Sequence, residues 1–210
     1  MSVCPVPGAN RNLAPGEFPE AALDIESEQD GIAILGGGCF WCTEAVYQQL
    51  NGVTHVESGY AGGSQDTANY HAVCSGESGH AEVIRIEYDP QRIRFGQILR
   101  VFFSIAHDPT QLNRQGNDMG TQYRSVIFPQ SEDQAEVARQ YIAQLNEAAA
   151  FQKPIVTRIE QGEYFPAEEY HQNYAALNPA QPYIAAVAAP KVAKLHQKLP
   201  HWARDSAKSS

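Results

Sequence analysis

The chain has 210 residues, of which 43% are hydrophobic, and this is enough apolar material for one domain with a sizeable core. Its formal net charge of −9 at pH 7 argues against nucleic acid or an anionic membrane surface as the main partner, because both attract clustered Lys and Arg. The sequence begins without a basic segment followed by an apolar run, and no apolar stretch approaches the ~20 residues that span a bilayer. We therefore expect a cytoplasmic enzyme. A monomer is the expected state.

The first half of the chain alternates between strand and helix patterns. Residues 1–30 are rich in prolines and acidic residues, which predicts an extended leader. The elements expected after it are strands at 31–36, 53–60 and 80–88, a helix at 39–50 and a short helix at 67–73. The strand at 80–88 is the clearest, because apolar side chains recur at every second position, at Ile84, Ile86 and Tyr88.

The second half of the chain continues the alternation and then becomes irregular. It predicts a helix at 95–106, a polar loop at 107–120, a strand at 122–128, a helix to about residue 150 and a last strand at 155–159. Ser131 and Gln134 form a capping-box pattern at the start of the long helix. The aromatic tail after Pro166 is expected to wrap the body or to close a site, and its last stretch, with Lys191 and Lys194, to be a solvated basic end.

This order of elements predicts a fold class. Strand–helix–strand units followed by further strands and helices indicate an α+β sandwich, with helices packed on one mixed or antiparallel sheet. Long coil insertions and an extended C-terminal tail complete it. We divide the chain into a leader at 1–30, a catalytic domain at 31–182 and a C-terminal tail at 183–210.

The four cysteines, Cys4, Cys39, Cys42 and Cys74, are too few and too unevenly placed for a disulfide-stapled scaffold. Two of them are three residues apart, and this spacing favours redox or metal chemistry at the close pair. Cys39 follows three glycines where a strand is expected to turn into a helix. The free amides of a helix start favour an anion, so we expect a lowered pKa for the Cys39 thiol.

Several side chains near the close pair are suited to take part in its chemistry. Cys42 lies within reach of Cys39 across the first helical turn, so the two thiols could form and reopen a disulfide. Phe40 and Trp41, between them, could form an apolar wall for a small group such as a methyl. Polar segments that contain Tyr70 with Glu82, Asp118 with Tyr123, and His171 lie where strand ends and loops would converge on Cys39.

Together these residues resemble the A-type peptide methionine sulfoxide reductase family, which reduces the S-epimer of methionine sulfoxide. The resemblance covers about residues 31–182, and its motifs occur in one order along the chain. They are Gly-Cys-Phe-Trp at 38–41, Val-Glu-Ser-Gly-Tyr-Ala-Gly-Gly at 56–63, the segment 70–76, Gly-His-Ala-Glu at 79–82, His-Asp-Pro-Thr at 107–110, the segments 114–118 and 120–125, and the segment 168–174. The family's fold, a ferredoxin-like α/β sandwich with extended coil, agrees with the predicted element order.

The resemblance implies that Cys39 is the nucleophile and that Phe40 and Trp41 hold the substrate's methyl group. It places Glu82, Tyr70 and Tyr123 around the sulfoxide oxygen, and it places Asp118 and His171 where they line or support the site. Negative charge develops on that oxygen during attack, so a carboxylic acid kept protonated by burial is a suitable proton donor. Tyrosine hydroxyls would stabilise the oxygen without carrying charge.

The same chemistry leaves Cys39 as a sulfenic acid, which a nearby thiol can convert to a disulfide. Many relatives carry resolving cysteines near the C-terminus, whereas this chain has none after Cys74. Cys42 is therefore the first candidate, with Cys74 and Cys4 as alternatives. The resemblance implies regeneration by thioredoxin or a small dithiol, no cofactor and no metal, and oxidised proteins, peptides or free methionine sulfoxide as substrates.

Two other functions remain open from the residues. A thioredoxin-like disulfide oxidoreductase would also use a Cys-X-X-Cys pair near a strand–helix junction, but it leaves Glu82 and the tyrosines without a role. A zinc site would use Cys39 and Cys42 with a histidine, although no second close ligand pair is evident.

Overall fold

The computed structural model describes residues 12–25 and 31–204, so Cys4 lies outside the described part. Its centre is a mixed sheet of six strands in the order β7-β6-β1-β3-β2-β8. Neighbouring strands run antiparallel except β6 and β7, which are parallel. The strands of this sheet are β1 (Gly31–Gly37), β2 (Val53–Ala61), β3 (Ala81–Tyr88), β6 (Ser125–Phe128), β7 (Arg158–Ile159) and β8 (Tyr164–Pro166). The predicted α+β class with one mixed sheet is confirmed.

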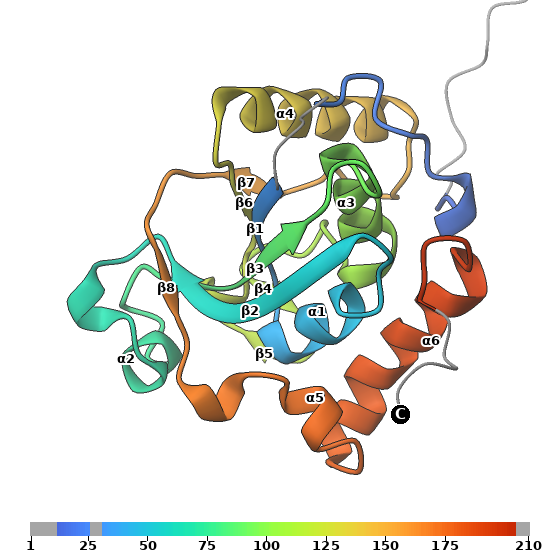
Figure 1. The fold of residues 1–210 in the computed structure, drawn as a ribbon. Coiled ribbons are helices and arrows are strands. Elements are labelled where there is room, and N and C mark those ends of the chain that lie inside the picture. Colours follow the sequence, from blue (N-terminus) through green and yellow to red (C-terminus); the bar gives the residue numbers. More distant parts are fainter. Residues whose placement is uncertain (1–11, 26–30, 205–210) are drawn as a thin grey trace, which may run out of the picture.

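Helices pack around this sheet (Figure 1), and two further strands form a separate small ribbon. The α-helices are α1 (Phe40–Tyr47), α2 (Tyr70–Cys74), α3 (Phe95–Val101), α4 (Glu132–Glu147), α5 (Tyr174–Leu177) and α6 (Ala189–Lys198). Two π-helical turns, Phe102–Ala106 and Ile184–Ala188, continue α3 and precede α6. The ribbon consists of β4 (Arg114–Gln115) and β5 (Asp118–Met119), within the segment predicted as a polar loop.

The alternation along β3 divides its side chains between two apolar cores. Ile84 and Ile86 belong to the larger core, to which α1, α3 and α4 contribute, whereas Val83 belongs to a smaller core formed with β1 and β6. Successive strand residues point to opposite faces of a sheet, so the two cores lie on its two sides. Glu82 is even-numbered like Ile84, and the pleat therefore directs it toward α1.

Several predicted boundaries are wrong in detail. The strand expected at 122–128 begins at Ser125, because Thr121–Tyr123 forms a 3-10 turn after Gly120. The strand expected at 155–159 is reduced to β7 and is not the last one, since β8 follows it and pairs with β2. The predicted capping box is only half formed. Ser131 accepts from the Gln134 amide at 3.1 Å, but the Gln134 side chain instead accepts from the Gln130 amide at 3.0 Å.

The chain after Pro166, called the tail below, packs on the body as expected but is helical rather than irregular. After β8 the chain passes α2 and runs through α5 into α6, which lies on the outer side of α1 (Figure 1). The ammonium groups of Lys191 and Lys194 donate to the carbonyls of Ala106 and Ser104, at 2.7 and 2.8 Å. These carbonyls belong to the last turn of the helix that begins as α3, where acceptors lack intrahelical partners and cations are favoured. The expected basic end is therefore packed on the body at Lys191, which is half-buried, whereas Lys194 stays exposed while its ammonium group binds a carbonyl.

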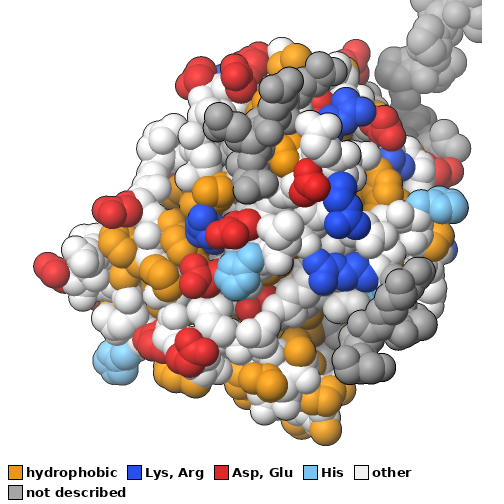
Figure 2. All heavy atoms as spheres, in the orientation of Figure 1, with side chains coloured by type: hydrophobic (Ala, Val, Ile, Leu, Met, Phe, Trp, Pro, Cys, Tyr) orange, Lys and Arg blue, Asp and Glu red, His pale blue; other side chains and the backbone are white. Residues whose placement is uncertain are grey.

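The described part of the leader lies along the surface formed by α3 and α4. Phe18 is buried, the Tyr141 hydroxyl of α4 donates to the Pro19 carbonyl at 2.8 Å, and the Gly96 amide of α3 donates to Asp24 Oδ1 at 2.9 Å. On the face shown in Figure 2, Lys and Arg side chains are interspersed with Asp and Glu. Among the described residues, none of the helices has the length and apolar character needed to cross a membrane.

Candidate active site

The tight turn between β1 and α1 places Cys39 at the start of a helix. Gly38 adopts φ +91°, a left-handed conformation that favours glycine, and a Cβ at this position would lie 2.6 Å from the Cβ of Gln115. Cys39 is the N-cap residue of α1, and Phe40 is the first helical residue. The predicted placement of a thiol at a strand-to-helix turn is confirmed.

Glu82 reaches this helix start from β3. Its Oε2 accepts the Phe40 amide at 3.0 Å, so the carboxyl satisfies one of the free amides of α1. Only 2% of Glu82 is exposed, and burial raises its pKa to about 8, against the opposing effect of the Phe40 amide. The carboxyl is therefore mostly protonated at neutral pH.

Tyr123 approaches from the 3-10 turn before β6, and its neighbour Arg124 anchors that turn. The Arg124 guanidinium donates to the carbonyls of Thr121 and Gly79, at 3.0 and 3.1 Å, and forms a largely buried ion pair with Glu160 at 2.7 Å. A planar guanidinium with several fixed donors suits such a junction. Arg124 thus ties the turn that carries Tyr123 to the segment that enters β3.

A cavity of about 250 Å³ connects these side chains. Seven of the nine predicted site residues line it. Gln181 and Tyr183 of the tail, which the sequence did not indicate, complete the lining. The lining residues are Cys39, Phe40, Trp41, Tyr70, Glu82, Asp118, Tyr123, Gln181 and Tyr183. The cavity joins a thiol, a neutral carboxyl and phenol groups to an apolar wall, within a volume suited to a small side chain.

The phenols of Tyr70 and Tyr123 both remain protonated at neutral pH. A hydrogen bond with the Cys74 thiol, followed by burial, raises the pKa of Tyr70 to about 12. Burial, with Glu82 nearby, raises the pKa of Tyr123 well above its usual value. Tyr70 is 38% exposed and so marks the mouth of the cavity. Both hydroxyls can donate hydrogen bonds to a ligand in the cavity.

The predicted lowering of the Cys39 pKa is wrong for the free protein. A hydrogen bond with the Cys42 thiol, burial and the nearby Glu82 raise the pKa of Cys39 well above its usual value, while the Trp41 amide acts in the opposite direction. Because the Phe40 amide already donates to Glu82, it is not free to stabilise a thiolate on Cys39. The same pairing lowers the pKa of Cys42, which is buried beside Cys39 and does not line the cavity.

The tail supplies Tyr183, the most informative residue that sequence reasoning missed. Its hydroxyl donates to Asp118 Oδ2 at 2.5 Å and lies 3.7 Å from the Cys42 sulfur. Burial, with the two thiols nearby, raises the pKa of Tyr183 well above its usual value. The only signal in the sequence was the length and aromatic character of the tail, which predicted closure of a site without indicating a residue.

His171 lies behind the cavity rather than in its wall. The Trp41 indole donates to His171 Nδ1 at 3.2 Å, so the neutral imidazole carries its proton on Nε2. Burial lowers the pKa of His171, which keeps the ring neutral near pH 7. His171 therefore supports the orientation of Trp41 and does not line the cavity.

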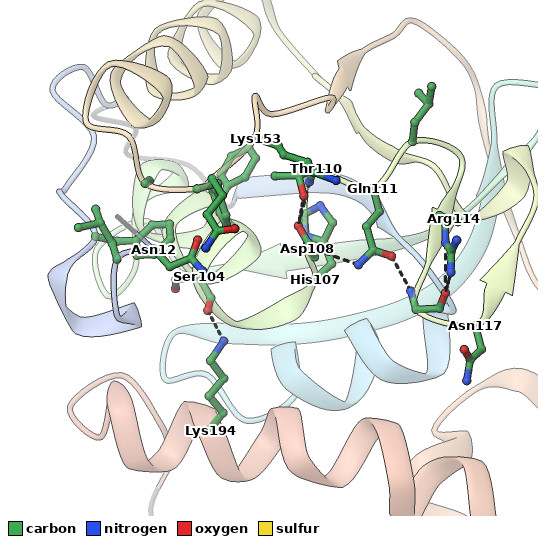
Figure 3. Close-up of a pocket in the computed structure, with 18 residues that line it drawn as sticks. Asn12, Ser104, His107, Asp108, Thr110, Gln111, Arg114, Asn117, Lys153 and Lys194 are labelled. Carbon is green, nitrogen blue, oxygen red and sulfur yellow. Dashed lines mark hydrogen bonds between the residues drawn. The ribbon is translucent and has the colours of Figure 1, made fainter. Parts of the chain in front are cut away.

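A larger cavity of about 850 Å³ lies elsewhere, between the leader, the loop after the Phe102–Ala106 turn and α6 (Figure 3). No cysteine among residues 12–25 and 31–204 and no residue of the predicted site lines it. Some of its polar groups are paired with one another: Asp108 accepts from Thr110 at 2.7 Å and from Gln111 at 2.9 Å. This arrangement holds the loop that leads to Asp118, and we place the chemistry in the smaller cavity despite the difference in size.

Within residues 12–25 and 31–204, no three His, Cys, Asp or Glu side chains converge as a metal-ligand set. The zinc alternative therefore has no ligand set in this part of the chain. A pair of adjacent thiols beside a protonated carboxyl and neutral phenols instead defines the site of a thiol-dependent oxidoreductase.

Comparison with known proteins identifies the family. The family model described as "Peptide methionine sulfoxide reductase" matches residues 31–203. The chain is 55% identical to peptide methionine sulfoxide reductase MsrA of Chromobacterium violaceum, over 80% of this chain and 96% of that protein. It is 53% identical to the MsrA of Polynucleobacter asymbioticus, over 79% of this chain and 87% of that protein. The chain belongs to the peptide methionine sulfoxide reductase family.

Solved structures agree in fold. Reduced Mxr1 of Saccharomyces cerevisiae is similar with a TM-score of 0.66 and 34% identity, over 79% of this chain and 94% of that chain. Methionine sulfoxide reductase A of Corynebacterium diphtheriae gives a TM-score of 0.62 and 31% identity, over 84% of this chain and 89% of that chain. Both similarities extend over most of the described domain.

Proposed function

We propose that this protein reduces the S-epimer of methionine sulfoxide, free or within proteins, with Cys39 as the nucleophile. The observation that carries the proposal is the small cavity in which Cys39, the protonated Glu82 and two neutral phenols meet an apolar wall. Membership of the reductase family supports it. The substrate's methyl group would lie against Phe40 and Trp41, and its oxygen would face Glu82 and the phenols.

In this mechanism the Cys39 sulfur attacks the sulfoxide sulfur while Glu82 gives its proton to the oxygen. Tyr70 and Tyr123 donate hydrogen bonds to that oxygen as its charge grows. Methionine leaves and Cys39 becomes a sulfenic acid, so the sulfoxide sulfur is reduced and the Cys39 sulfur is oxidised. The S–O bond of the substrate breaks as the protonated oxygen passes to the Cys39 sulfur, and the proton lost by the Cys39 thiol returns Glu82 to its acid form.

Cys42 is the proposed resolving thiol. Its lowered pKa and its position beside Cys39 suit attack on the sulfenic acid, which forms a disulfide and releases water. Cys42 is buried whereas Cys39 is partly exposed, so an incoming dithiol would attack the Cys39 sulfur and displace Cys42. We propose thioredoxin, or a small dithiol in its place, as this reductant, with the protein acting as a cytoplasmic monomer.

One experiment tests the proposed function directly. The reduced protein is incubated with each epimer of methionine sulfoxide without added reductant, and the products are mapped by mass spectrometry. We expect about one methionine per protein from the S-epimer only, together with a Cys39–Cys42 disulfide. Release from neither epimer, with reduction of insulin disulfides instead, would favour the thioredoxin-like alternative.

Replacement of Cys42 separates resolution from the first step. In Cys42→Ser we expect one methionine released in the first turnover, an oxidised Cys39, and a fall of at least about tenfold in thioredoxin-supported turnover, because no adjacent thiol forms the exchangeable disulfide. Turnover with dithiothreitol should fall less, since a small thiol can reduce the sulfenic acid directly. Undiminished turnover with thioredoxin would instead assign resolution to Cys74, to Cys4 or to direct reduction.

A further inference from the structure

Glu44 is a fully buried carboxyl that the proposed reaction does not use. It lies on α1, two residues after Cys42, and is 0% exposed. Its Oε1 accepts the Asn173 amide at 3.0 Å, and the Ser58 hydroxyl and the Tyr174 amide are its other polar neighbours. Burial raises the pKa of Glu44 to about 7, and the Asn173 amide, the Ser58 hydroxyl and the Tyr174 amide oppose that shift. Burial of a carboxyl without a cationic partner costs free energy. Its presence here therefore indicates that Glu44 has a structural or functional role.

The residue bound by Glu44 occupies a special backbone conformation. Asn173 has φ +56°, in the left-handed region, and is the N-cap residue of α5. Its side chain accepts from Gln48 Nε2 at 2.8 Å, so two residues of the α1 segment hold Asn173 from different sides. Tyr174 follows this turn directly, so the conformation of the turn sets the orientation of the Tyr174 side chain.

Tyr174 lies directly against Trp41 of the cavity wall. The two rings are stacked with their centroids 3.8 Å apart and their planes 11° apart. Trp41 and Glu44 are three residues apart on α1, so they project from neighbouring positions on one side of the helix and both contact the tail at residues 173–174. The indole N–H of Trp41 is bound by His171 of the same tail. The tail therefore orients Trp41 at two points, and Glu44 anchors the tail between α1 and α5.

We infer that Glu44 is a positioning residue, which fixes the apolar wall for the substrate's methyl group through Asn173, Tyr174 and Trp41. The inference rests on the proposed function, since it assigns the wall to substrate binding. Without the Glu44 acceptor the Asn173 amide loses its partner, the left-handed turn relaxes and the Tyr174 ring leaves Trp41. The methyl site then widens, while the Glu82 carboxyl stays in place because it is held by the Phe40 amide.

The test compares Glu44→Met, which removes the acceptor at similar volume, with Glu44→Gln, whose amide oxygen can still accept. For Glu44→Met we expect KM for the S-epimer to rise about tenfold, the scale of one lost hydrogen bond to a charged group, with the single-turnover rate at saturation within about threefold. Glu44→Gln should recover most of the affinity. Asp24→Leu is the matched control, because it removes a carboxylate–amide contact between the leader and α3 and does not touch the turn at Asn173.

A second measurement follows Trp41 itself. Its indole N–H signal in a ¹⁵N spectrum, assigned with Trp202→Phe, should shift and exchange faster in Glu44→Met and stay unchanged in Asp24→Leu. If the parent protein reduces neither epimer, the proposed function fails, and this signal still decides the coupling between Glu44 and Trp41. An unchanged Trp41 signal and an unchanged KM would overturn the inference.

Tyr174→Leu tests the link between Tyr174 and Trp41 without touching Glu44, because it removes the stacked ring and leaves the carboxyl paired. We expect KM for the S-epimer to rise about tenfold in this variant, and Glu44→Gln in the Tyr174→Leu background to cause no further rise, since both residues act through Trp41. Additive effects in the double variant, or an unchanged KM in Tyr174→Leu, would show that Glu44 has only a general role in stability.

Discussion

Cys39→Ser is expected to abolish methionine release, with a fall of at least about a thousandfold in single-turnover rate. A hydroxyl at this position is far harder to ionise than a thiol and cannot form a sulfenic acid. The fold should survive, because serine fits the N-cap position and is among the preferred residues there. Rapid quench with the S-epimer, followed by quantification of methionine, measures the loss.

The matched control is Cys42→Ser, which makes the same chemical change three residues further along and should keep the first turnover. Thermal unfolding of both variants shows whether either change perturbs the fold. Near-normal methionine release by Cys39→Ser would remove Cys39 from the role of nucleophile and direct attention to Cys42.

Glu82→Gln should slow the sulfoxide step about a hundredfold or more, the usual scale of general acid catalysis. The amide oxygen can still accept the Phe40 amide, so the start of α1 is preserved while the transferable proton is lost. Glu57→Gln is the matched control, since the Glu57 carboxyl accepts from the Tyr164 hydroxyl at 2.9 Å and does not line the cavity. Single-turnover rates of the three proteins, measured at saturating S-epimer, separate the chemical step from recycling.

The same residue predicts the pH dependence of the chemical step. Because burial raises the pKa of Glu82 to about 8, its acid form predominates below pH 8 and is lost as the pH rises above it. Deprotonation removes the donor and adds a negative charge beside Cys39, which opposes formation of its thiolate. We therefore expect the single-turnover rate of the parent to fall above about pH 8, and this fall to be absent in Glu82→Gln. A fall of equal size in both proteins would assign the proton to another group.

The sequence alone determined the local features around the thiols. Glycines before Cys39 require a tight turn at the end of an apolar strand, and the structure places the thiol at the N-cap of α1. The period-two pattern of β3 determined which side chains share a face, and so directed Glu82 toward α1. These features depend on backbone conformation and on contacts between adjacent elements, which short patterns specify well.

The surroundings of those thiols depend on how distant segments pack together. Tyr183 reaches Asp118 and Cys42 because the tail returns across α1 as a helix, and no pattern within the tail encodes that path. The direction of the Cys39 pKa shift was also decided by this packing, since burial, the Cys42 thiol and Glu82 outweigh the helix start. Tertiary packing also supplies the partners of Lys191 and Lys194, which are carbonyls 85 and 90 residues away along the chain. Burial and long-range pairing depend on how distant segments come together, and that arrangement is a property of the whole packed chain rather than of any one segment.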